Sequence, residues 1–207
     1  MMLPSSKRLG DFGIATVLIF LALPVAGLVL GVMAVDMLVC PADRGSFLHR
    51  ERRVSRGREF DLLKLRTLRA DVLDRIRGPD DHARIHEAVE TNLTWAGRRL
   101  LKPWYLDELP QLVNILRGEM SLVGPRPWPP AMVARQIERG VDYRLRVRAG
   151  WTGPAQVSKG KDVSFETLDL GYVERSSRST GVQLLRYDLG ILRRTVRTLV
   201  RGEGLRF

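Results

Sequence analysis

The centre of the chain carries two adjacent carboxylates, Asp107 and Glu108, within the stretch Tyr-Leu-Asp-Glu-Leu-Pro-Gln-Leu at 105–112. An aspartate can attack phosphorus to give an acyl phosphate, which divides one transfer reaction into two steps. Adjacent carboxylates can also bind Mg²⁺, which neutralises charge on a diphosphate as its bond breaks. A structural role is the other interpretation, in which Asp107 caps an amphipathic helix over 107–117 and Glu108 is favoured in its first turn.

Chemistry on phosphate also needs cations, and the sequence offers several at positions where the backbone should be fixed. A β-hairpin is predicted with arms near 47–54 and 59–66, so Lys64 and Arg66 fall near the end of its second arm. A short apolar strand should end in a rigid turn, in which prolines fix the backbone on both sides of Arg126. The candidate phosphate ligands are therefore Lys64, Arg66, Arg126 and, in a glycine-rich loop, Lys161.

The composition is strongly basic. The 207 residues include 34 Lys plus Arg against 23 Asp plus Glu, for a formal net charge of +11. This excess favours an anionic partner such as nucleic acid, membrane headgroups or a phosphorylated substrate, although a GC-rich genome would give the same arginine-rich composition. The sequence has no recognised nucleic-acid-binding module and no regular interleaving of aromatic and basic residues, so we expect no nucleic-acid partner. The single cysteine, Cys40, excludes an intramolecular disulfide.

The N-terminal part has the composition of a membrane segment. No charged residue occurs from Phe12 to Val35, a length sufficient to cross a hydrocarbon core of roughly 30 Å as a helix. The run is longer than the apolar part of a cleaved signal peptide, and no clean small-residue cleavage site follows before Asp36. The sequence therefore indicates a membrane protein.

Pro24 and the flanking charges argue against a straight span. Pro24 lies in the middle of the apolar run, where it lacks the N–H for a helical hydrogen bond and should kink or break the helix. Lys7 and Arg8 precede the run and six arginines lie between residues 44 and 58 after it. The positive-inside rule then places both ends on the cytoplasmic side. We predict a re-entrant helix-hairpin, with residues 1–40 forming the N-terminal tail and this hairpin.

Residues 41–207 are predicted to form one compact α+β unit. Further helices are expected from a cap at Asp80 or Asp81 to residue 92, over about 130–146 and over about 185–201. The last has an apolar stripe with arginines elsewhere, a pattern typical of a helix on an anionic membrane surface. Packing of that stripe on the protein's own core explains the pattern equally well.

Together these segments resemble the bacterial sugar transferases, also called monotopic phosphoglycosyl transferases. The matching segments follow the family's order over nearly the whole chain, and the central block is highly specific. They are KRLGDF at 7–12, the Pro-broken apolar run, KLRT at 64–67, LDELPQLVNILRGEMSLVGPRP at 106–127, GWTGPAQV at 150–157 and LDLGYV at 168–173.

The resemblance implies an enzyme of the bacterial inner (cytoplasmic) membrane with its catalytic domain on the cytoplasmic face. Such an enzyme transfers a phosphosugar from a nucleoside diphosphate sugar, usually a UDP-sugar, to polyprenyl phosphate and releases UMP. The product starts assembly of a glycan such as exopolysaccharide. The implied fold is a re-entrant hairpin with surface helices around a small β element. The basic composition adds anionic lipid headgroups as an expected partner, and the sequence does not decide between a monomer and a homodimer.

The resemblance also implies roles for individual residues. Asp107 resembles the nucleophile that forms a covalent phosphosugar intermediate, and Glu108 resembles its partner in Mg²⁺ binding or in the second attack. Lys64 and Arg66 match the family's basic strand, and Lys161 is a further candidate phosphate ligand. The family's rigid turn near the donor phosphates or nucleotide corresponds to Gly124, Pro125, Arg126 and Pro127.

The sequence departs from the family pattern at several places. Leu23 stands where a serine is common before Pro24, and Trp151 stands where isoleucine is usual. The stretch 103–105 before the carboxylate pair is bulkier and one residue longer. The alternative function is a membrane scaffold that keeps the fold without catalysis and holds glycan-assembly partners through its basic surface. Against it, the Asp-Glu pair and both basic motifs are present.

Overall fold

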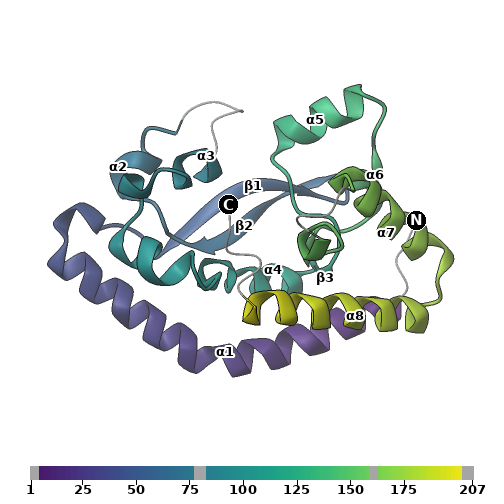
Figure 1. The fold of residues 1–207 in the computed structure, drawn as a ribbon, viewed down its shortest axis with the longest axis horizontal. Coiled ribbons are helices and arrows are strands. Elements are labelled where there is room, and N and C mark those ends of the chain that lie inside the picture. The colour runs from purple at the N-terminus through teal and green to yellow at the C-terminus, as the bar shows by residue number, and fades with distance from the viewer. Residues whose placement is uncertain (1–4, 77–82, 159–162, 202–207) are drawn as a thin grey trace.

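The computed structural model describes residues 5–76, 83–158 and 163–201. Over these residues, helices surround small two-stranded sheets, with the long helix α1 along one edge of the molecule (Figure 1). The predicted α+β class is therefore confirmed in its coarse form. The expected helix cap at Asp80 or Asp81 and the candidate ligand Lys161 lie outside the described residues.

Helix α1 runs from Ser5 to Val39 without interruption, although Pro24 lies inside it. Figure 1 shows that α1 bends near its middle, so the expected break at Pro24 is instead a bend in a continuous helix. Among the described residues, α1 is the helix long and apolar enough to cross a membrane, and 11% of its most apolar window is buried in the protein. A core helix would be mostly buried, so this exposure is compatible with membrane association.

The predicted hairpin is confirmed. β1 (Leu48–Ser55) pairs antiparallel with β2 (Arg58–Leu65), which leaves a two-residue turn between them. Both turn residues have positive φ, 51° at Arg56 and 72° at Gly57. This is the pattern of a type I′ turn, whose twist matches that of the flanking strands.

Alternation along the strands gives the hairpin two different faces. Glu51 lies directly opposite Leu62 and Arg53 directly opposite Phe60, so these side chains share one face. Lys64, two residues after Leu62, lies on that face as well. Buried charges and apolar side chains are therefore gathered on one side of the hairpin.

A second sheet pairs β3 (Ser121–Val123) in parallel with β4 (Gly150–Thr152). The chain approaches itself closely just after β3, since a Cβ atom at Gly124 would lie 2.5 Å from the carbonyl oxygen of Arg148. Only glycine allows this approach. The turn that follows Gly124 is therefore held directly against β4.

The main core lies where α1, α4 (Gln111–Arg117), α8 (Gly181–Val200) and the two sheets meet. A second cluster joins Val29 and Met33, in the C-terminal half of α1, with Leu65 and Leu101. The main core consists of Ala15, Phe60, Leu62, Leu112, Ile115, Met120, Leu122, Val123, Tyr172, Leu184 and Ile191. Both halves of α1 thus pack on the same body.

Charged residues at the start of α1 anchor it to several elements. Lys7, which is 2% exposed, pairs with Asp188 of α8 and lies 3.7 Å from Asp11. Asp11 accepts a hydrogen bond of 2.7 Å from the hydroxyl group of Ser121 in β3. Arg8 donates to carbonyl groups in the last turn of α4, which satisfies groups that a helix end leaves unpaired. The N-terminal end of α1 is therefore fixed by buried polar contacts.

The helix predicted over 130–146 is wrong, because the structure has two helices there. These are α5 (Pro130–Glu138) and α6 (Tyr143–Arg146). Gly140, with φ of 79°, follows α5 and takes the left-handed conformation that ends helices. The short helices α2 (Ala70–Leu73) and α3 (Ala83–Glu87) lie between β2 and the centre of the chain.

Helices α7 (Phe165–Arg178) and α8 complete the described chain, and Figure 1 shows α8 alongside α1. α8 begins earlier than predicted, at Gly181, because Thr180 forms a capping box there. Its Leu184 and Ile191 are buried in the main core, but neither belongs to the predicted apolar stripe, of which Leu189, Val196, Leu199 and Val200 are exposed. Most of the stripe therefore does not pack on the protein's own core, and its placement on a membrane surface stays a prediction. A second set of apolar side chains on α8 is exposed: Val182, Leu189, Val196, Leu199 and Val200.

Candidate active site

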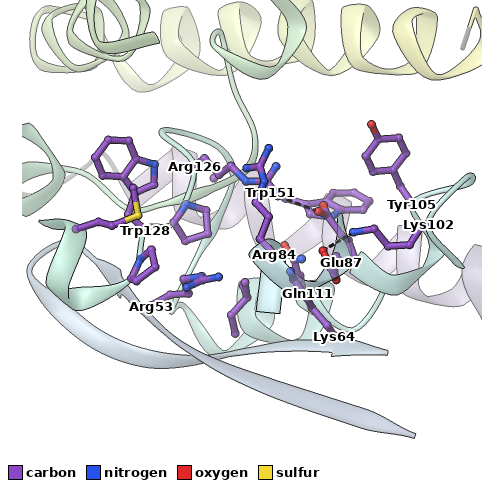
Figure 2. A pocket seen from close by; sticks show the side chains of 16 residues that line it. Arg53, Lys64, Arg84, Glu87, Lys102, Tyr105, Gln111, Arg126, Trp128 and Trp151 are labelled. Atoms are coloured by element: carbon purple, nitrogen blue, oxygen red, sulfur yellow. Dashed lines mark hydrogen bonds and ion pairs between the residues drawn. The ribbon is translucent and has the colours of Figure 1, made fainter. Parts of the chain in front are cut away.

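A cavity of about 280 Å³ opens between the β1–β2 hairpin, the segment around the carboxylate pair and the turn before α5 (Figure 2). Its size is close to the lower end of the range for small-molecule sites, roughly 300–1,000 Å³. The predicted residues Lys64, Glu108, Arg126 and Pro127 all line it. The fold thus brings together four of the nine catalytic and substrate-binding residues that the sequence singled out, while Asp107 is buried and does not line the cavity.

Asp107 lies in a 3₁₀ turn, Leu106–Glu108, with 2% of its surface exposed. The Nζ atom of Lys102 is 3.9 Å from its Oδ2 atom. Burial disfavours the ionised carboxylate and the charge of Glu108 adds to this effect, so the pKa of Asp107 is raised to about 7. Asp107 can therefore change charge near neutral pH, a property that many catalytic groups share.

The interpretation of Asp107 as a helix cap is wrong. Helix α4 begins at Gln111, and Pro110 occupies its N-cap position. Pro110 has no N–H to donate to the carbonyl group of Leu106, so the helical ladder of hydrogen bonds cannot continue back through the carboxylate pair. Asp107 and Glu108 therefore lie on a separate short turn before the helix.

Glu108 lines the cavity, and its Oε1 atom is 3.4 Å from the guanidinium of Arg126. Mg²⁺ usually binds one or two carboxylates and completes its shell with water and substrate phosphates. Glu108 can supply one such carboxylate from the cavity wall, with Asp107 next to it in the chain. Their mutual repulsion, which contributes to the raised pKa of Asp107, is the kind of charge that a divalent cation offsets.

Lys64 is buried on the cavity side of the hairpin, with its Nζ atom 2.9 Å from the Oε1 atom of Glu51. Burial alone would lower the pKa of Lys64, but Glu51 and Glu87 outweigh it and the pKa is raised. Burial likewise opposes ionisation of Glu51, yet Lys64 and Arg53 hold its pKa at about 2. Lys64 is therefore a fixed cation at neutral pH.

Sequence analysis missed Glu87 and Lys102, which form an ion pair of 2.7 Å at the cavity wall (Figure 2). Glu87 also accepts a hydrogen bond of 2.8 Å from the Thr67 hydroxyl group. Burial raises the pKa of Glu87, but Lys64 and Lys102 outweigh this and lower it. The one available signal was that Lys102 is among only five lysines in so basic a chain.

Arg66 does not reach the cavity. It is 2% exposed and donates hydrogen bonds to the backbone carbonyl groups of Asp43, Ser46 and Leu68. Strand β2 ends at Leu65, so the alternation that places Lys64 toward the cavity does not extend to Arg66. Its position supports a role in fixing the loop before β1 and not the predicted role in binding substrate.

The predicted Gly-Pro-Arg-Pro turn divides into two parts. Arg126 and Pro127 line the cavity, whereas Gly124 and Pro125 are buried behind them. The carbonyl group of Pro125 accepts a hydrogen bond of 2.8 Å from the N–H of Gly150 in β4. Gly124 and Pro125 thus hold the turn in place, and Arg126 and Pro127 face the cavity.

The segment that leads to the carboxylate pair has an unusual backbone. Gly97–Leu101 forms a π-helical turn, a form that adds one residue to the course of a helix and often marks functional sites. Tyr105, which lines the cavity, has φ of 55°, an uncommon value for a residue other than glycine.

Comparison with known proteins places these features in context. The model of the family described as Bacterial sugar transferase matches residues 3–202. The UDP-galactose-lipid carrier transferase of Erwinia amylovora is 34% identical over 198 residues, which cover 88% of this chain and 39% of that protein. The exopolysaccharide production protein ExoY of Sinorhizobium fredii is 34% identical over 217 aligned positions. The match covers 96% of this chain and 87% of that protein.

A third relative is the UDP-glucose:undecaprenyl-phosphate glucose-1-phosphate transferase of Caulobacter vibrioides. It is 36% identical over 157 residues, which cover 72% of this chain and 54% of that protein. The chain thus spans well under half the length of the Erwinia relative and about half of the Caulobacter one. It spans most of the Sinorhizobium relative.

Proposed function

Because the chain belongs to the bacterial sugar transferase family, we propose that it is a polyprenyl-phosphate phosphoglycosyl transferase. It moves a phosphosugar from a UDP-sugar to polyprenyl phosphate and releases UMP. Relatives named for UDP-galactose, UDP-glucose and undecaprenyl phosphate support this donor and acceptor. The relative named for exopolysaccharide production supports a role in starting a glycan.

In the first step, an Oδ atom of ionised Asp107 attacks the phosphorus that bears the sugar. As this O–P bond forms, the bond from the same phosphorus to the bridging oxygen breaks, and UMP leaves with that oxygen and the electron pair. The raised pKa of about 7 supports this role, because a more basic carboxylate is a better nucleophile and still ionises near neutral pH.

In the second step, an oxygen of polyprenyl phosphate attacks the phosphorus of the covalent intermediate. The bond to Asp107 breaks and the carboxylate is regenerated, while the sugar remains on the newly formed polyprenyl diphosphate. Glu108 faces the cavity and accepts the proton of the acceptor phosphate when that oxygen carries one. The two carboxylates therefore have different roles.

The cations around the pair hold the negative charge of the diphosphate. Lys64, Lys102 and Arg126 line the cavity, and Lys102 lies beside the nucleophile. Their ion pairs with Glu51, Glu87 and Glu108 fix them before substrate arrives, which lowers the cost of reorganisation during the reaction. Mg²⁺ held by Glu108 and Asp107 would neutralise further charge on the diphosphate.

We also propose that α1 is re-entrant, with both ends at the cytoplasmic face of the bacterial inner membrane. Both halves of α1 pack on the same body, through Ala15 in one half and Met33 in the other. A straight span would separate those halves across the bilayer. The bend at Pro24, the exposed apolar residues of α1 and the basic residues beyond both ends support this placement.

Site-directed labelling tests the membrane placement. In a Cys40→Ala background, Ser6→Cys and Ser46→Cys each place one thiol at an exposed position beyond the apolar part of α1. An impermeant thiol reagent should label both from the cytoplasmic side of inverted vesicles and neither from the outside of intact spheroplasts. Labelling of the two sites from opposite sides would contradict the re-entrant geometry.

The buried Asp107 among fixed cations is the observation that carries the proposed activity. Purified protein with Mg²⁺, a panel of UDP-sugars and undecaprenyl phosphate should release UMP. Asp107→Asn should abolish release, while Asp142→Asn, which changes an exposed carboxylate on α6's N-terminal side, should not. Release that survives in Asp107→Asn would remove the proposed nucleophile.

The scaffold without catalysis is the alternative function. It predicts no UMP release with any donor of the panel and no dependence of glycan assembly on Asp107. Complementation of a strain that lacks the chain separates the two functions. Recovery by Asp107→Asn supports the scaffold, and recovery by the unchanged protein alone supports the transferase.

A further inference from the structure

The cavity has one end that the chemistry at Asp107 and Glu108 does not use. Figure 2 shows Trp128 on one side of the cavity and Lys102 on the other, with Arg126 between them. Beside Trp128, the cavity is lined by Pro127, Pro129 and Met132, which are neighbours of Trp128 in the chain. This end offers an aromatic ring in apolar surroundings.

Trp128 is held rigidly. Its carbonyl group accepts a hydrogen bond of 3.0 Å from the N–H of Val54 in β1, and a proline on each side restricts the backbone. The guanidinium of Arg144 lies 3.9 Å from the centre of the Trp128 ring. Arg144 does not line the cavity, so it covers the side of the ring that faces the protein. The ring surface that remains is the one that lines the cavity.

Arg144 is itself fixed by buried partners. It is 5% exposed and donates to Gln136 Oε1 at 3.0 Å and to Asp169 Oδ2 at 3.2 Å. It also donates to the carbonyl group of Arg126. One buried cation therefore orients both the phosphate-facing residue Arg126 and the aromatic residue Trp128, and the two are held at a set separation.

The chemistry of this end selects a planar, largely apolar group. A sugar ring needs polar partners for its hydroxyl groups. Arg53 lies at the same end as Trp128 (Figure 2), but it is buried and already paired with Glu51, whereas Glu87, Lys102 and Glu108 lie at the other end. The polyprenyl chain is also a poor match. Figure 1 shows α5, which begins just after Trp128, on the side of the hairpin away from α1, where the lipid would reach the protein.

We propose that Trp128 is the base-stacking residue of a nucleotide subsite and that the uracil ring of the donor lies against it. The nucleoside then occupies the end near Trp128, and the diphosphate extends past Arg126 toward the carboxylate pair. This inference rests on the proposed function, which supplies the nucleoside diphosphate. It adds the orientation of the donor within the cavity and a residue that determines donor affinity.

Binding of ligands to the full chain in detergent, measured by calorimetry, tests the subsite without requiring turnover. The ligands are UMP, which carries the base, and inorganic pyrophosphate, which does not. Trp128→Leu keeps an apolar side chain but removes the aromatic face, and we expect UMP to bind about tenfold more weakly or worse. Pyrophosphate should bind as to the unchanged protein, and Trp128→Tyr should retain most UMP affinity.

Trp95→Leu is the matched control, because Trp95 is about half exposed and does not line the cavity. It should leave the affinity for both ligands unchanged. Equal weakening of UMP and pyrophosphate in Trp128→Leu would overturn the stacking role, since it would report a distorted phosphate site. Unchanged UMP affinity together with altered selectivity among UDP-sugars would also overturn it, because the ring would then contact the sugar.

The same measurements separate this inference from the proposed transferase activity. UMP binding that depends on Trp128 in a protein that transfers no sugar would support the subsite and contradict the transferase. Sugar transfer at normal rates and donor KM in Trp128→Leu would support the transferase and overturn the subsite.

Discussion

At the scale of single residues, the proposed chemistry depends on the charge of Asp107. Only the ionised carboxylate attacks phosphorus, and burial with the charge of Glu108 raises its pKa to about 7. We therefore expect kcat/KM for the donor to rise with pH through about 7 and to level off above it. A profile of kcat/KM at fixed Mg²⁺ measures this, and a flat profile across neutral pH would contradict the assignment.

Two neighbours should shift the midpoint of that profile in opposite directions. The charge of Lys102 lowers the pKa of Asp107, so Lys102→Met should move the midpoint to higher pH. The charge of Glu108 raises it, so Glu108→Gln should move the midpoint to lower pH. The midpoint, and not the rate itself, is the quantity to compare, because both side chains line the cavity. Shifts in the same direction would show that another group titrates.

Asp107 should also reduce stability at the pH where it is active. Its pKa is 3.8 in the unfolded chain and about 7 in the fold, so the stability present below about pH 4 is lost as the pH rises to about 7. Asp107→Asn removes this loss, and we expect it to stabilise the protein at pH 8 by a few kcal/mol while having little effect at pH 4.

Thermal unfolding of both proteins at each pH measures the difference. Asp142→Asn is the control, because its carboxylate is exposed and pairs with Arg146 on the surface. An Asp107→Asn protein that is less stable than the unchanged protein at pH 8 would contradict the burial argument. A stabilised but inactive variant would be typical of a catalytic residue, whose environment serves the reaction at the expense of stability.

At the scale of elements, local sequence patterns were sufficient to predict the structure where one residue determines the backbone conformation. The hairpin was predictable because Gly57 permits the positive φ of a two-residue turn between alternating strands. The division of residues 130–146 into two helices was not predictable, because the apolar pattern continues across Gly140 although the helical backbone ends before it. The prediction that Asp107 caps the helix was wrong, because Pro110 separates the turn that carries the two carboxylates from α4.

Contacts between elements were the part of the site that no local pattern could supply. Glu87 of α3 lines the cavity and Glu51 of β1 is buried beside Lys64, and each pairs with a lysine from a different segment. Lys64 was found because it lies within β2, whereas Arg66 was assigned to the same face although the strand had already ended. Charge pairing across the fold therefore determines which of the predicted cations face substrate.

The turn before α5 offers a test of coupling between elements. Arg144 of α6 contacts both Arg126 and Trp128, and Arg144→Lys keeps the charge opposite Asp169 but loses the planar fork and the stacked ring. We expect KM for the donor to rise about tenfold with a smaller change in kcat, because the carboxylate pair is not touched. Steady-state kinetics measure this split.

Arg146→Lys is the control, since Arg146 is largely exposed and pairs with Asp142. Arg144→Met should behave differently from Arg144→Lys. It leaves Asp169 buried without a cation and should lower the melting temperature as well as donor affinity. A fall in kcat with unchanged KM in Arg144→Lys would exclude a role in holding the donor.

At the scale of the whole molecule, α1 belongs to the same core as the remainder of the protein. Its Ala15 lies in the main cluster, and Val29 and Met33 contact the segment that leads to the carboxylate pair. The apolar composition of α1 predicted the membrane, but it could not predict these contacts, since they depend on which face of the helix meets α4 and α8. The bend at Pro24 therefore bears on the position of the site as well as on the membrane.

The buried charges at the start of α1 should be essential to this arrangement. Lys7 pairs with Asp188 of α8 and lies near Asp11, and Lys7→Met leaves both carboxylates buried without their cation. Breaking a buried pair by removing one partner costs about 3–5 kcal/mol. We therefore expect Lys7→Met to unfold at a markedly lower temperature and to lose transferase activity.

The double variant Lys7→Met, Asp188→Leu removes one of the stranded charges and fills the space with an apolar side chain. It should be more stable than Lys7→Met alone, because Tyr172, which also contacts Asp188, still donates to the carbonyl group of Val123. Arg178→Met, at an exposed pair with Glu174, should change little. If the double variant were destabilised by the sum of the single changes, Lys7 and Asp188 would act independently. The attachment of α1 to α8 would then rest on apolar packing alone.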